Sequence, residues 1–445
     1  MPCIEMIGRP NALMGWDGQR AYLAEDLATG TPPPTRLDGV AAAVQLLDDG
    51  SARLFRDRLG IAKLFWARSP DGTLRFSARP IELIRAGHRL DDIAAVPRGY
   101  WAELDPRGHV RHETIFALPK PADGNTTPSL EEIGGRIRRG IDNYLAAIAK
   151  AYRDRPVFVC LSGGLDSSTV AVLARRHFPD MTAVSFDLSG PNRGSSEDRI
   201  AARRLADDLG IGMIESTVTV DKLLSYLDTV LVEGIDWRDF NVHCALVNAA
   251  IAETIAEKIA GNFPCGNGSP LVITGDLANE FLVDYTAESY RGETYYALPR
   301  LSPSRLQSIL LQGLETSHRE VGVFEAWGID VVQPYAVAAD AYLSLPPDFL
   351  ADDARKNRLV REIVGNELPN YIYDRPKVRA QIGGTDTAGG TLAACIDNGI
   401  DEAFLRHRFA ELHDINEEEA LDRFIRAGRY RSAVPTPAEV THESV

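Results

Sequence analysis

The stretch Val157-Phe-Val-Cys-Leu-Ser-Gly-Gly-Leu-Asp-Ser-Ser168 decides the fold of this chain. A short apolar run leads into two glycines, an aspartate and two serines, and an amphipathic segment follows; this order predicts a strand, a tight turn and a helix. Gly163 and Gly164 let the main chain approach a bulky anion, to which the serine hydroxyls and the free N–H groups of the new helix donate hydrogen bonds. The expected anion is a nucleotide phosphate.

The turn is not a P-loop, because no lysine follows its glycines. It carries Asp166 instead, and a carboxylate repels phosphate unless a metal ion lies between them, which indicates Mg²⁺. The alternative interpretation is an ordinary glycine-rich turn whose aspartate and serines cap the helix. The remainder of the chain has to decide between the two.

Composition excludes several classes of function. The chain has 445 residues, so at least two domains are expected, and its 44% hydrophobic and 25% charged residues are typical of a soluble globular protein. The formal net charge of −15 argues against nucleic-acid and anionic-membrane partners. The five cysteines are scattered, and no signal peptide or membrane-spanning run is recognisable. We expect a cytoplasmic protein without disulfides or zinc.

The chain divides by local composition. Residues 1–118 contain short β-like runs between turn signals and predict a β-rich domain. Residues 119–128 are rich in Pro, Gly and polar residues and predict a linker. Residues 129–432 form the second domain, and 433–445 are expected to be a flexible tail. The clearest β-like runs are 41–47, 51–55 and 74–77.

The second domain opens with the capping box Ser129-x-x-Glu132, followed by apolar residues at helical spacing. Strand and helix patterns then alternate, which predicts an α/β fold, a parallel sheet covered by helices on both faces. The segments Ser162–Ser168 and Thr274–Glu280 both follow strands, so both turns should face one site at the carboxyl edge of the sheet. We expect strands at 157–161, 182–188, 213–220 and 271–274, and helices at 167–177, at 195–209 up to Gly210, and over 401–431.

The turn at Ser162 resembles the S-G-G-x-D-S loop of N-type ATP pyrophosphatases, and three later segments extend the resemblance. They are Thr274-Gly-Asp-Leu-Ala-Asn-Glu280, His318–Tyr335 and Leu368–Lys377. In this order they resemble segments of the asparagine synthetase family, which includes asparagine synthetases, β-lactam and carbapenam synthetases, and lasso-peptide macrolactam cyclases. These enzymes activate a carboxylate as its adenylate and let an amine displace AMP. The resemblance implies a synthetase domain of adenine-nucleotide alpha-hydrolase (HUP-like) type.

The resemblance also implies ATP and Mg²⁺ as cofactors. Lys377 would stabilise the pentavalent transition state and the departing pyrophosphate, unless it is an ordinary solvated lysine. Asp276 would take the proton of the attacking amine, or else cap a helix. Asn279 stands where the family has an acidic, metal-associated residue, so Glu280 becomes the catalytic and metal-binding candidate beside Asp166. The implied nucleotide contacts are Leu161, Ser162, Gly163, Gly164, Asp166, Ser167, Ser168, Ser185, Thr274 and Gly275.

Four further charged residues are weaker candidates. Lys356 and Arg358 could contact phosphate, and Arg319 and Glu320 could contact substrate. For the second pair we favour a buried ion pair.

Residues 55–66 resemble a segment of the family's glutaminase half, which is an Ntn-hydrolase-like sandwich. A glutaminase of this type uses a cysteine directly after the removable Met1, and the base is that cysteine's own α-amino group. Here Pro2 intervenes, Cys3 has no free amine, and the glutamine-binding N-G-E and S-D-T-E segments are missing. We therefore expect a degenerate scaffold that does not hydrolyse glutamine.

Together these expectations describe an ATP- and Mg²⁺-dependent ligase of specialised (antibiotic) metabolism. It would join a small-molecule carboxylic acid to an amine that does not come from glutamine. Lactam-forming cyclisation and ammonia-dependent amidation remain alternatives within the family, and a non-catalytic nucleotide-binding relative is the alternative of another class. A tRNA thiolase is disfavoured by the acidic charge and the absence of paired cysteines. Assembly as a homodimer is left open.

Overall fold

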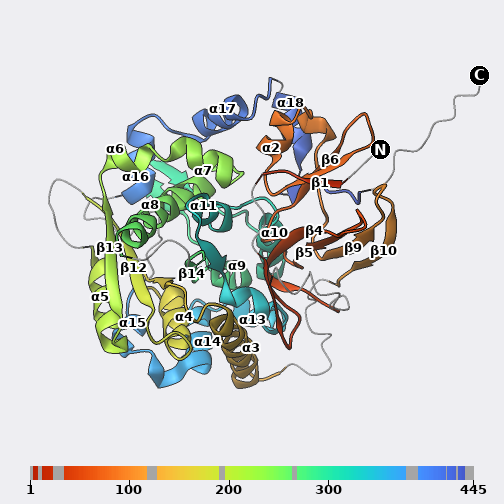
Figure 1. Cartoon of the computed structure of the whole chain (residues 1–445). Helices are drawn as coiled ribbons and strands as arrows, with labels where there is room; N and C mark the ends of the chain where they lie inside the picture. Colours follow the sequence, from red (N-terminus) through yellow and green to blue (C-terminus); the bar gives the residue numbers. More distant parts are fainter. Residues whose placement is uncertain are drawn as a thin grey trace, which may run out of the picture.

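The computed structural model of the chain is drawn in Figure 1. It describes residues 4–8, 13–23, 35–117, 128–189, 196–262, 268–376, 389–416, 418–426 and 429–435. Apart from Pro128, the predicted linker lies outside these ranges, as does Lys377.

Two β-sheets form the first part of the chain (Figure 1). The larger has six antiparallel strands in the order β10-β9-β5-β4-β2-β3; the smaller has four, in the order β1-β7-β6-β8, with β1 parallel to β7. All three β-like runs named from the sequence are strands. The bounds are β1 Ile4–Met6, β2 Leu13–Trp16, β3 Ala21–Leu23, β4 Asp38–Leu46, β5 Ala52–Arg56, β6 Phe65–Arg68, β7 Leu74–Ser77, β8 Ala94–Ala95, β9 Tyr100–Leu104 and β10 Val110–Ile115.

Apolar side chains hold the two sheets together. Alternate residues of β6 are buried, which is the period-two pattern of a strand with one covered face. Leu54 and Leu104 of the larger sheet are fully buried in the same cluster as Phe65 and Phe76 of the smaller one. The sheets therefore share one core. Two short helices, α2 Pro80–Arg85 and the 3₁₀ helix η1 Leu90–Asp92, follow β7.

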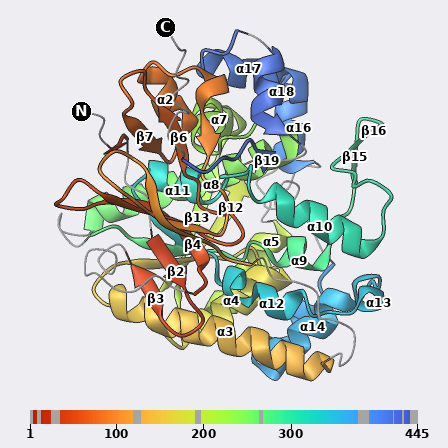
Figure 2. The same ribbon diagram turned by 90° about the vertical axis from the view of Figure 1, so that its right-hand side faces the viewer.

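Helix α3, Leu130–Ala151, links the sheets to the rest of the chain. The predicted capping box is present: Glu132 N donates to Ser129 Oγ at 3.1 Å, and Ser129 N donates to Glu132 Oε2 at 2.8 Å. The apolar stripe of the helix is buried as expected. Tyr144 of α3 donates a hydrogen bond to the carbonyl of Met14 in β2 at 2.8 Å. Figure 2 shows α3 running beneath β2 and β3.

A five-stranded parallel sheet forms the centre of the second part, in the order β13-β12-β11-β14-β17. The chain starts at the central strand β11, moves outward to β13, and returns to β14 on the other side of β11. Its parallel direction confirms the predicted α/β fold, and the edge strand β17 is an addition that we did not predict. The bounds are β11 Val157–Cys160, β12 Thr182–Leu188, β13 Gly212–Val218, β14 Leu271–Ile273 and β17 Asp330–Val332.

Helices cover both faces of this sheet. The outward connections contain α4 and α5, and the return connections contain α8 and α11, so right-handed crossovers put the two pairs on opposite faces. Figure 1 shows the two sets on either side of β12 and β14. Gly210 ends α5 in the left-handed conformation, φ 63°, as its sequence position predicted.

Further short helices surround the sheet. The helices of this part are α4 Leu165–Arg175, α5 Glu197–Leu209, α6 Val220–Leu224, α7 Leu227–Glu233, α8 Asp239–Asn262, α9 Ala278–Leu282, α10 Pro303–Gly313, α11 Val321–Ala326, η2 Pro334–Ala338, α12 Ala339–Tyr342, α13 Pro347–Leu350, α14 Arg355–Val364, η3 Gly365–Glu367 and α15 Asn370–Tyr373. The strands β15 Glu288–Tyr290 and β16 Glu293–Tyr295 form a hairpin between α9 and α10. Among the described helices, none has the length and apolar character that crossing a bilayer requires.

The end of the described chain differs from the prediction of a helix over 401–431. The helices α16 Gly390–Asp397, α17 Glu402–Leu412 and α18 Glu418–Phe424 are followed by a hairpin of β18 Ile425–Arg426 and β19 Arg429–Tyr430. The hairpin forms because of a contact with a distant part of the chain. Tyr430 is buried, and its ring lies edge-on to Phe65 of the smaller sheet at a centroid distance of 5.1 Å. Packing of this aromatic ring outweighs local helix propensity.

The predicted flexible tail is held at its first residue. Ala433 N donates to the carbonyl of Ala95 at 3.0 Å, and the indole N–H of Trp66 donates to the carbonyl of Ala433 at 2.8 Å. Residues 436–445 lie outside the described residues.

The capping box of α3 gives the first testable prediction. In S129A one N–H at the start of α3 loses its acceptor, so we expect the free energy of unfolding to fall by about 1 kcal/mol, measured as a lower midpoint in urea. S289A, which changes an exposed serine of β15, serves as the control. An unchanged midpoint in S129A would contradict a stabilising cap.

Candidate active site

A cavity of about 390 Å³ lies at the carboxyl edge of the parallel sheet. Residues that follow β11 and β14 line it, together with residues of β12. Because the chain leaves β11 toward one side and returns to β14 on the other, this is the switch point of the sheet, where α/β proteins bind ligands. Residues of α8, α14 and the segment after α9 complete the wall.

The glycine-rich turn forms one wall of the cavity. It begins where β11 ends, and α4 starts after Gly164. The hydroxyl oxygens of Ser162 and Ser167 lie 3.0 Å apart, Ser162 N donates to Ser167 Oγ at 3.2 Å, and Gly164 N donates to Ser162 Oγ at 3.3 Å. Gly163 has φ 71°, and a Cβ there would lie 2.7 Å from Cβ of Ala201. The turn thus holds its shape through its own serines and requires glycine.

The second turn touches the first through main-chain atoms. A Cβ on Gly275 would lie 2.7 Å from the N atom of Ser167 and 3.0 Å from the carbonyl carbon of Asp166. No side chain fits into this space, so only glycine lets the ends of β11 and β14 approach so closely. This contact confirms that the two turns face one site.

Most of the nucleotide contacts predicted from the sequence line the cavity. Gly163 instead shapes the turn, and Ser168 and Thr274 are buried behind the cavity wall, so their side chains support the turns. The predicted residues that line the cavity are Leu161, Ser162, Gly164, Asp166, Ser167, Ser185, Gly275 and Asp276.

The ammonium group of Lys356 occupies an oxygen cage beside the turn. Its Nζ donates to Oδ2 of Asp166 at 2.7 Å and to Oδ2 of Asp284 at 2.7 Å, and it also contacts Oδ1 of Asn279. The two carboxylates outweigh desolvation and raise the pKa of Lys356 above its usual value. Lys356, a weaker candidate from the sequence, therefore lies inside the site, whereas Arg358 pairs with Asp352 at the surface.

The donor set at Asp166 fits a Mg²⁺ ion carried in by a nucleotide. Its Oδ1 is buried and has no hydrogen-bond partner among the described residues. Mg²⁺ commonly uses one or two carboxylates and takes its remaining oxygens from phosphate and water. Within the described ranges, no group of three or more His, Cys, Asp or Glu residues is arranged to hold a metal by itself. Oδ1 of Asp166 is thus the carboxylate oxygen on this wall that could bind a metal–nucleotide complex.

Asp276 lines the cavity beyond the end of β14. Burial and the nearby carboxylate of Glu320 raise the pKa of Asp276 to about 8, although the guanidinium of Arg319 opposes this rise. A carboxyl group with such a pKa is mostly protonated at neutral pH and becomes a base slightly above it. It is therefore suited to accept a proton from a reacting group.

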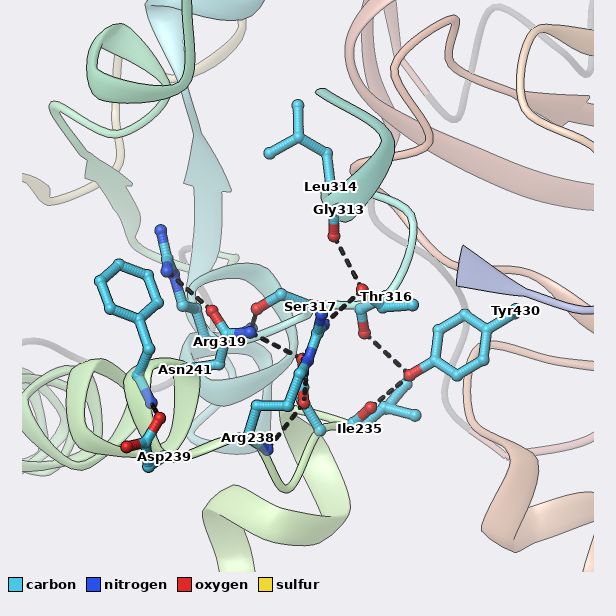
Figure 3. Close-up of polar contacts among 12 residues, drawn as sticks. Ile235, Arg238, Asp239, Asn241, Gly313, Leu314, Thr316, Ser317, Arg319 and Tyr430 are labelled. Carbon is cyan, nitrogen blue, oxygen red and sulfur yellow. Dashed lines mark hydrogen bonds and ion pairs between the residues drawn. The ribbon is translucent and has the colours of Figure 1, made fainter. Parts of the chain in front are cut away.

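Arg319 lies beside Asp276, and its surroundings confirm the predicted ion pair with Glu320. Its Nη1 donates to Oδ1 of Asn241 at 2.8 Å, a contact drawn in Figure 3, and its Nη2 donates to Oε1 of Glu280 at 3.2 Å. Glu280 also accepts a hydrogen bond from the hydroxyl of Tyr285 at 2.6 Å.

Glu280 is therefore not placed as the sequence suggested. The prediction made it a catalytic and metal-binding residue, but its side chain is buried, is absent from the cavity wall, and is paired with Arg319. It acts as a support of the arginine in this arrangement. The catalytic and metal-binding roles of Glu280 stay predictions.

A polar network, drawn in part in Figure 3, connects Arg319 to Arg238: Asn241 contacts Arg319 and donates to Asp236, to which Arg238 also donates. Arg238 donates to the hydroxyl of Thr316, which donates to the carbonyl of Gly313 at 2.8 Å. The hydroxyl of Tyr430 lies 2.8 Å from the carbonyl of Thr316 and contacts the carbonyl of Ile235, a residue with φ 51°. The hairpin at the end of the described chain thus reaches the loops that precede α8 and α11.

Arg375 and Asp198 are among the cavity residues that sequence reasoning missed. Arg375 donates to the carbonyl of Gly163 at 3.0 Å and pairs with Asp198, so it braces the glycine-rich turn from outside. Arg375 falls in the quoted segment Leu368–Lys377, which was the available signal. Asp198, at the start of α5, had no signal.

The helix α9 is held between two strained residues. Leu277 has φ 84° and Val283 has φ 52°, both in the left-handed region that branched and bulky residues avoid. Arg355 donates to the carbonyls of Leu282 and Val283, at 2.7 Å each, and fixes this conformation. Strain of this kind persists where the surroundings over-determine the backbone, as at binding sites.

Lys377, the predicted transition-state residue, lies one residue beyond Pro376, which is described and lines the cavity. Its role stays a prediction.

Comparison with known proteins agrees with this geometry. Residues 145–320 match the model of the asparagine synthase family. The chain is 25% identical over 397 residues to the asparagine synthetase [glutamine-hydrolyzing] of Bos taurus, covering 82% of this chain and 68% of the relative. Over most of its length the chain is thus similar to asparagine synthetases. The Homo sapiens enzyme is also 25% identical, over 400 residues, with 83% and 68% covered. The resemblance inferred from four short segments is confirmed.

Solved structures give weaker likenesses. For the NMN synthetase of Francisella tularensis the identity is 15% and the TM-score 0.29, with 66% of this chain and 96% of that chain covered. For the NH3-dependent NAD synthetase of Campylobacter jejuni they are 19% and 0.24, with 36% and 62% covered. TM-scores this low establish no common fold.

Gly275 gives a prediction about the join of the two turns. In G275A the new Cβ must push the Asp166–Ser167 peptide away, so we expect loss of nucleotide binding in calorimetry together with a lower melting temperature. G313A is the matched control, because a Cβ on Gly313 meets nothing within 4 Å. Nucleotide binding by G275A equal to that of the wild type would contradict the close contact.

Asp276 gives a prediction about pH. Because its pKa is about 8, the rate of a step that needs the base form should rise with pH through about 8, and D276N should lose this dependence. Stability moves the other way: the unfolded carboxyl ionises near its usual 3.8, whereas the folded one stays protonated up to about 8. The free energy of unfolding should therefore fall as pH rises between these values, and fall less in D276N. Identical pH profiles of both proteins would refute the assignment.

Proposed function

We propose that this chain is an ATP- and Mg²⁺-dependent ligase that forms an amide bond through an acyl-adenylate. The observation that carries the proposal is the placement of the glycine-rich turn and of Asp276 on the walls of one cavity at the switch point of the sheet. The match to the asparagine synthase family supports the same chemistry. In this proposal Ser162–Ser168 binds the phosphates and Ser185 lies on the nucleotide side.

In the first step a carboxylate oxygen of the acid attacks the α-phosphorus of ATP. The bond from that phosphorus to the bridging oxygen breaks, and pyrophosphate leaves with the electron pair. Main-chain N–H groups, Ser162 and Ser167 bind the phosphate oxygens, while Lys377 and Lys356 offset their charge. Asp166 would hold Mg²⁺, and the charge of that ion would offset the negative charge of the leaving group.

In the second step the amine nitrogen attacks the acyl carbon of the adenylate. The bond from this carbon to the AMP oxygen breaks, AMP leaves, and one proton of the nitrogen passes to Asp276. A carboxylate alone reacts poorly because its leaving group would be oxide or hydroxide, whereas AMP is a stable leaving group. The two walls of the cavity thus serve successive steps.

The nitrogen source in this proposal is an amine other than glutamine, and the sheets of the first part act as a degenerate Ntn-like scaffold. Arg56, in the segment that resembles the glutaminase half, supports a structural role. It is fully buried, and its guanidinium donates to the carbonyls of Gly60, Ala62 and Val96. Cys3 lies outside the described residues.

The proposal extends to setting and partners. We propose a cytoplasmic enzyme of specialised metabolism with small-molecule substrates. One observation favours a second candidate, a non-catalytic nucleotide-binding relative: Lys356 fills the space between Asp166, Asn279 and Asp284, and Asn279 replaces an acid of the family. ATP–pyrophosphate exchange with a panel of acids separates the two, since a non-catalytic relative shows none.

Lys377 is the sharpest single test of adenylation. K377M should lower the rate of pyrophosphate release by roughly 10²- to 10³-fold, because one cation that stabilises the transition state is removed. ATP binding should persist. K150M, at an exposed lysine in the last turn of α3, is the control. Substantial turnover by K377M would refute its role.

A further inference from the structure

One end of the cavity has a different character from the phosphate-binding turn. Helix α8 turns one face toward it, since Phe240, Cys244, Val247 and Ile251 recur at intervals of three and four residues and all line the cavity. At the start of this helix the wall is completed by Asp276, Tyr285 and Arg319. We call the part lined by Phe240, Cys244, Asp276, Tyr285 and Arg319 the acceptor end.

Aromatic rings build the acceptor end. Phe240 meets Tyr285 edge-on at a centroid distance of 5.4 Å and Tyr296 at 5.5 Å. Tyr296 is itself tied to His243 of α8, its hydroxyl lying 2.5 Å from Nδ1. The rings of Phe240 and Tyr285 are therefore fixed in place, with an apolar surface exposed to the cavity.

The charges around the acceptor end are unbalanced toward the negative. Three carboxyl groups, of Asp276, Glu280 and Glu320, surround the single guanidinium of Arg319, and two of them pair with it directly. The carboxylate of a substrate would find the charge of Arg319 already neutralised by its two partners. The carboxylates at this end would therefore repel it. A cation, by contrast, would favour the ionised form of Asp276 and pair with it. One face of the Phe240 ring is already covered by the guanidinium of Arg319, whose central carbon lies 5.1 Å from the ring centroid.

Cations on the other walls do not change this balance. Lys356 is paired with Asp166 and Asp284, and Arg375 is paired with Asp198. Thus each described cation that lines the cavity already has a carboxylate partner. Lys356 and Arg375 lie on the side of the phosphate-binding turn.

We propose that the acceptor end binds the amine substrate and selects a primary amine on an aryl or alkyl body that has no carboxylate close to its nitrogen. The inference rests on the proposed function and specifies the class of amine that attacks the acyl-adenylate. The amine binds as an ammonium against Asp276 and loses one proton to solvent, which makes it the neutral nucleophile. Its second proton passes to the Asp276 carboxylate when the nitrogen attacks the acyl carbon. The product would be an amide of such an amine, which is chemically unlike asparagine.

The test measures binding and needs no turnover. The probes are 2-phenylethylamine, 3-phenylpropanoate and L-phenylalanine, which share a ring and differ in charge, titrated calorimetrically into the full chain. We expect the amine to bind at least about tenfold more tightly than either carboxylate, about 1.4 kcal/mol. D276N should lose this preference, and D353N, which removes a carboxylate elsewhere on the cavity wall, should keep it.

A second variant tests the aromatic wall and guards against misfolding of D276N. F240A should lower the affinity for 2-phenylethylamine more than that for ethylamine, because only the former loses ring contact. Equal binding of the three probes, tighter binding of a carboxylate, or no binding of the amine overturns the inference. The proposed function fails separately, if ATP yields no AMP and pyrophosphate with any acid and amine.

Discussion

The contact between Gly275 and the Asp166–Ser167 peptide is the constraint on which the rest of the site depends. Two strand ends that are neighbours in the sheet but more than one hundred residues apart in the chain meet there through main-chain atoms. Because the join has no side chain, the donors of the glycine-rich turn and the carboxyl group of Asp276 have fixed positions relative to each other. A nucleotide and a nucleophile can then be held at the two ends of one space.

Charge is distributed along this space in pairs. At the phosphate side Lys356 and Arg375 each hold a carboxylate, so that side keeps its cations close without leaving them unsatisfied. At the opposite side one guanidinium serves several carboxylates. Since charges in a partly buried cavity are weakly screened, this asymmetry favours an anion at the first side and a cation at the second.

The sequence predicted correctly those features that depend on local patterns of residues. The strand–turn–helix at Ser162, the capping box of α3 and the parallel sheet follow from residue order within short windows. The position of Glu280 and the cage of Lys356 could not be read in this way, because both depend on partners, Arg319 and Asp166, contributed by distant segments. The hairpin at Tyr430 was missed for the same reason: its strands form because the ring enters a pocket made by other parts of the chain.

Tyr430 joins elements from three parts of the chain: Phe65 of the smaller sheet, Ile235 before α8 and Thr316 before α11. During synthesis, the sheets and most helices can therefore form before the loops that support Arg319 acquire their last partner. A chain that has not yet been extended past residue 430 would carry an assembled fold with an incompletely fixed acceptor end. The hairpin of β18 and β19 would therefore complete the loops behind the acceptor end after the rest of the fold has formed.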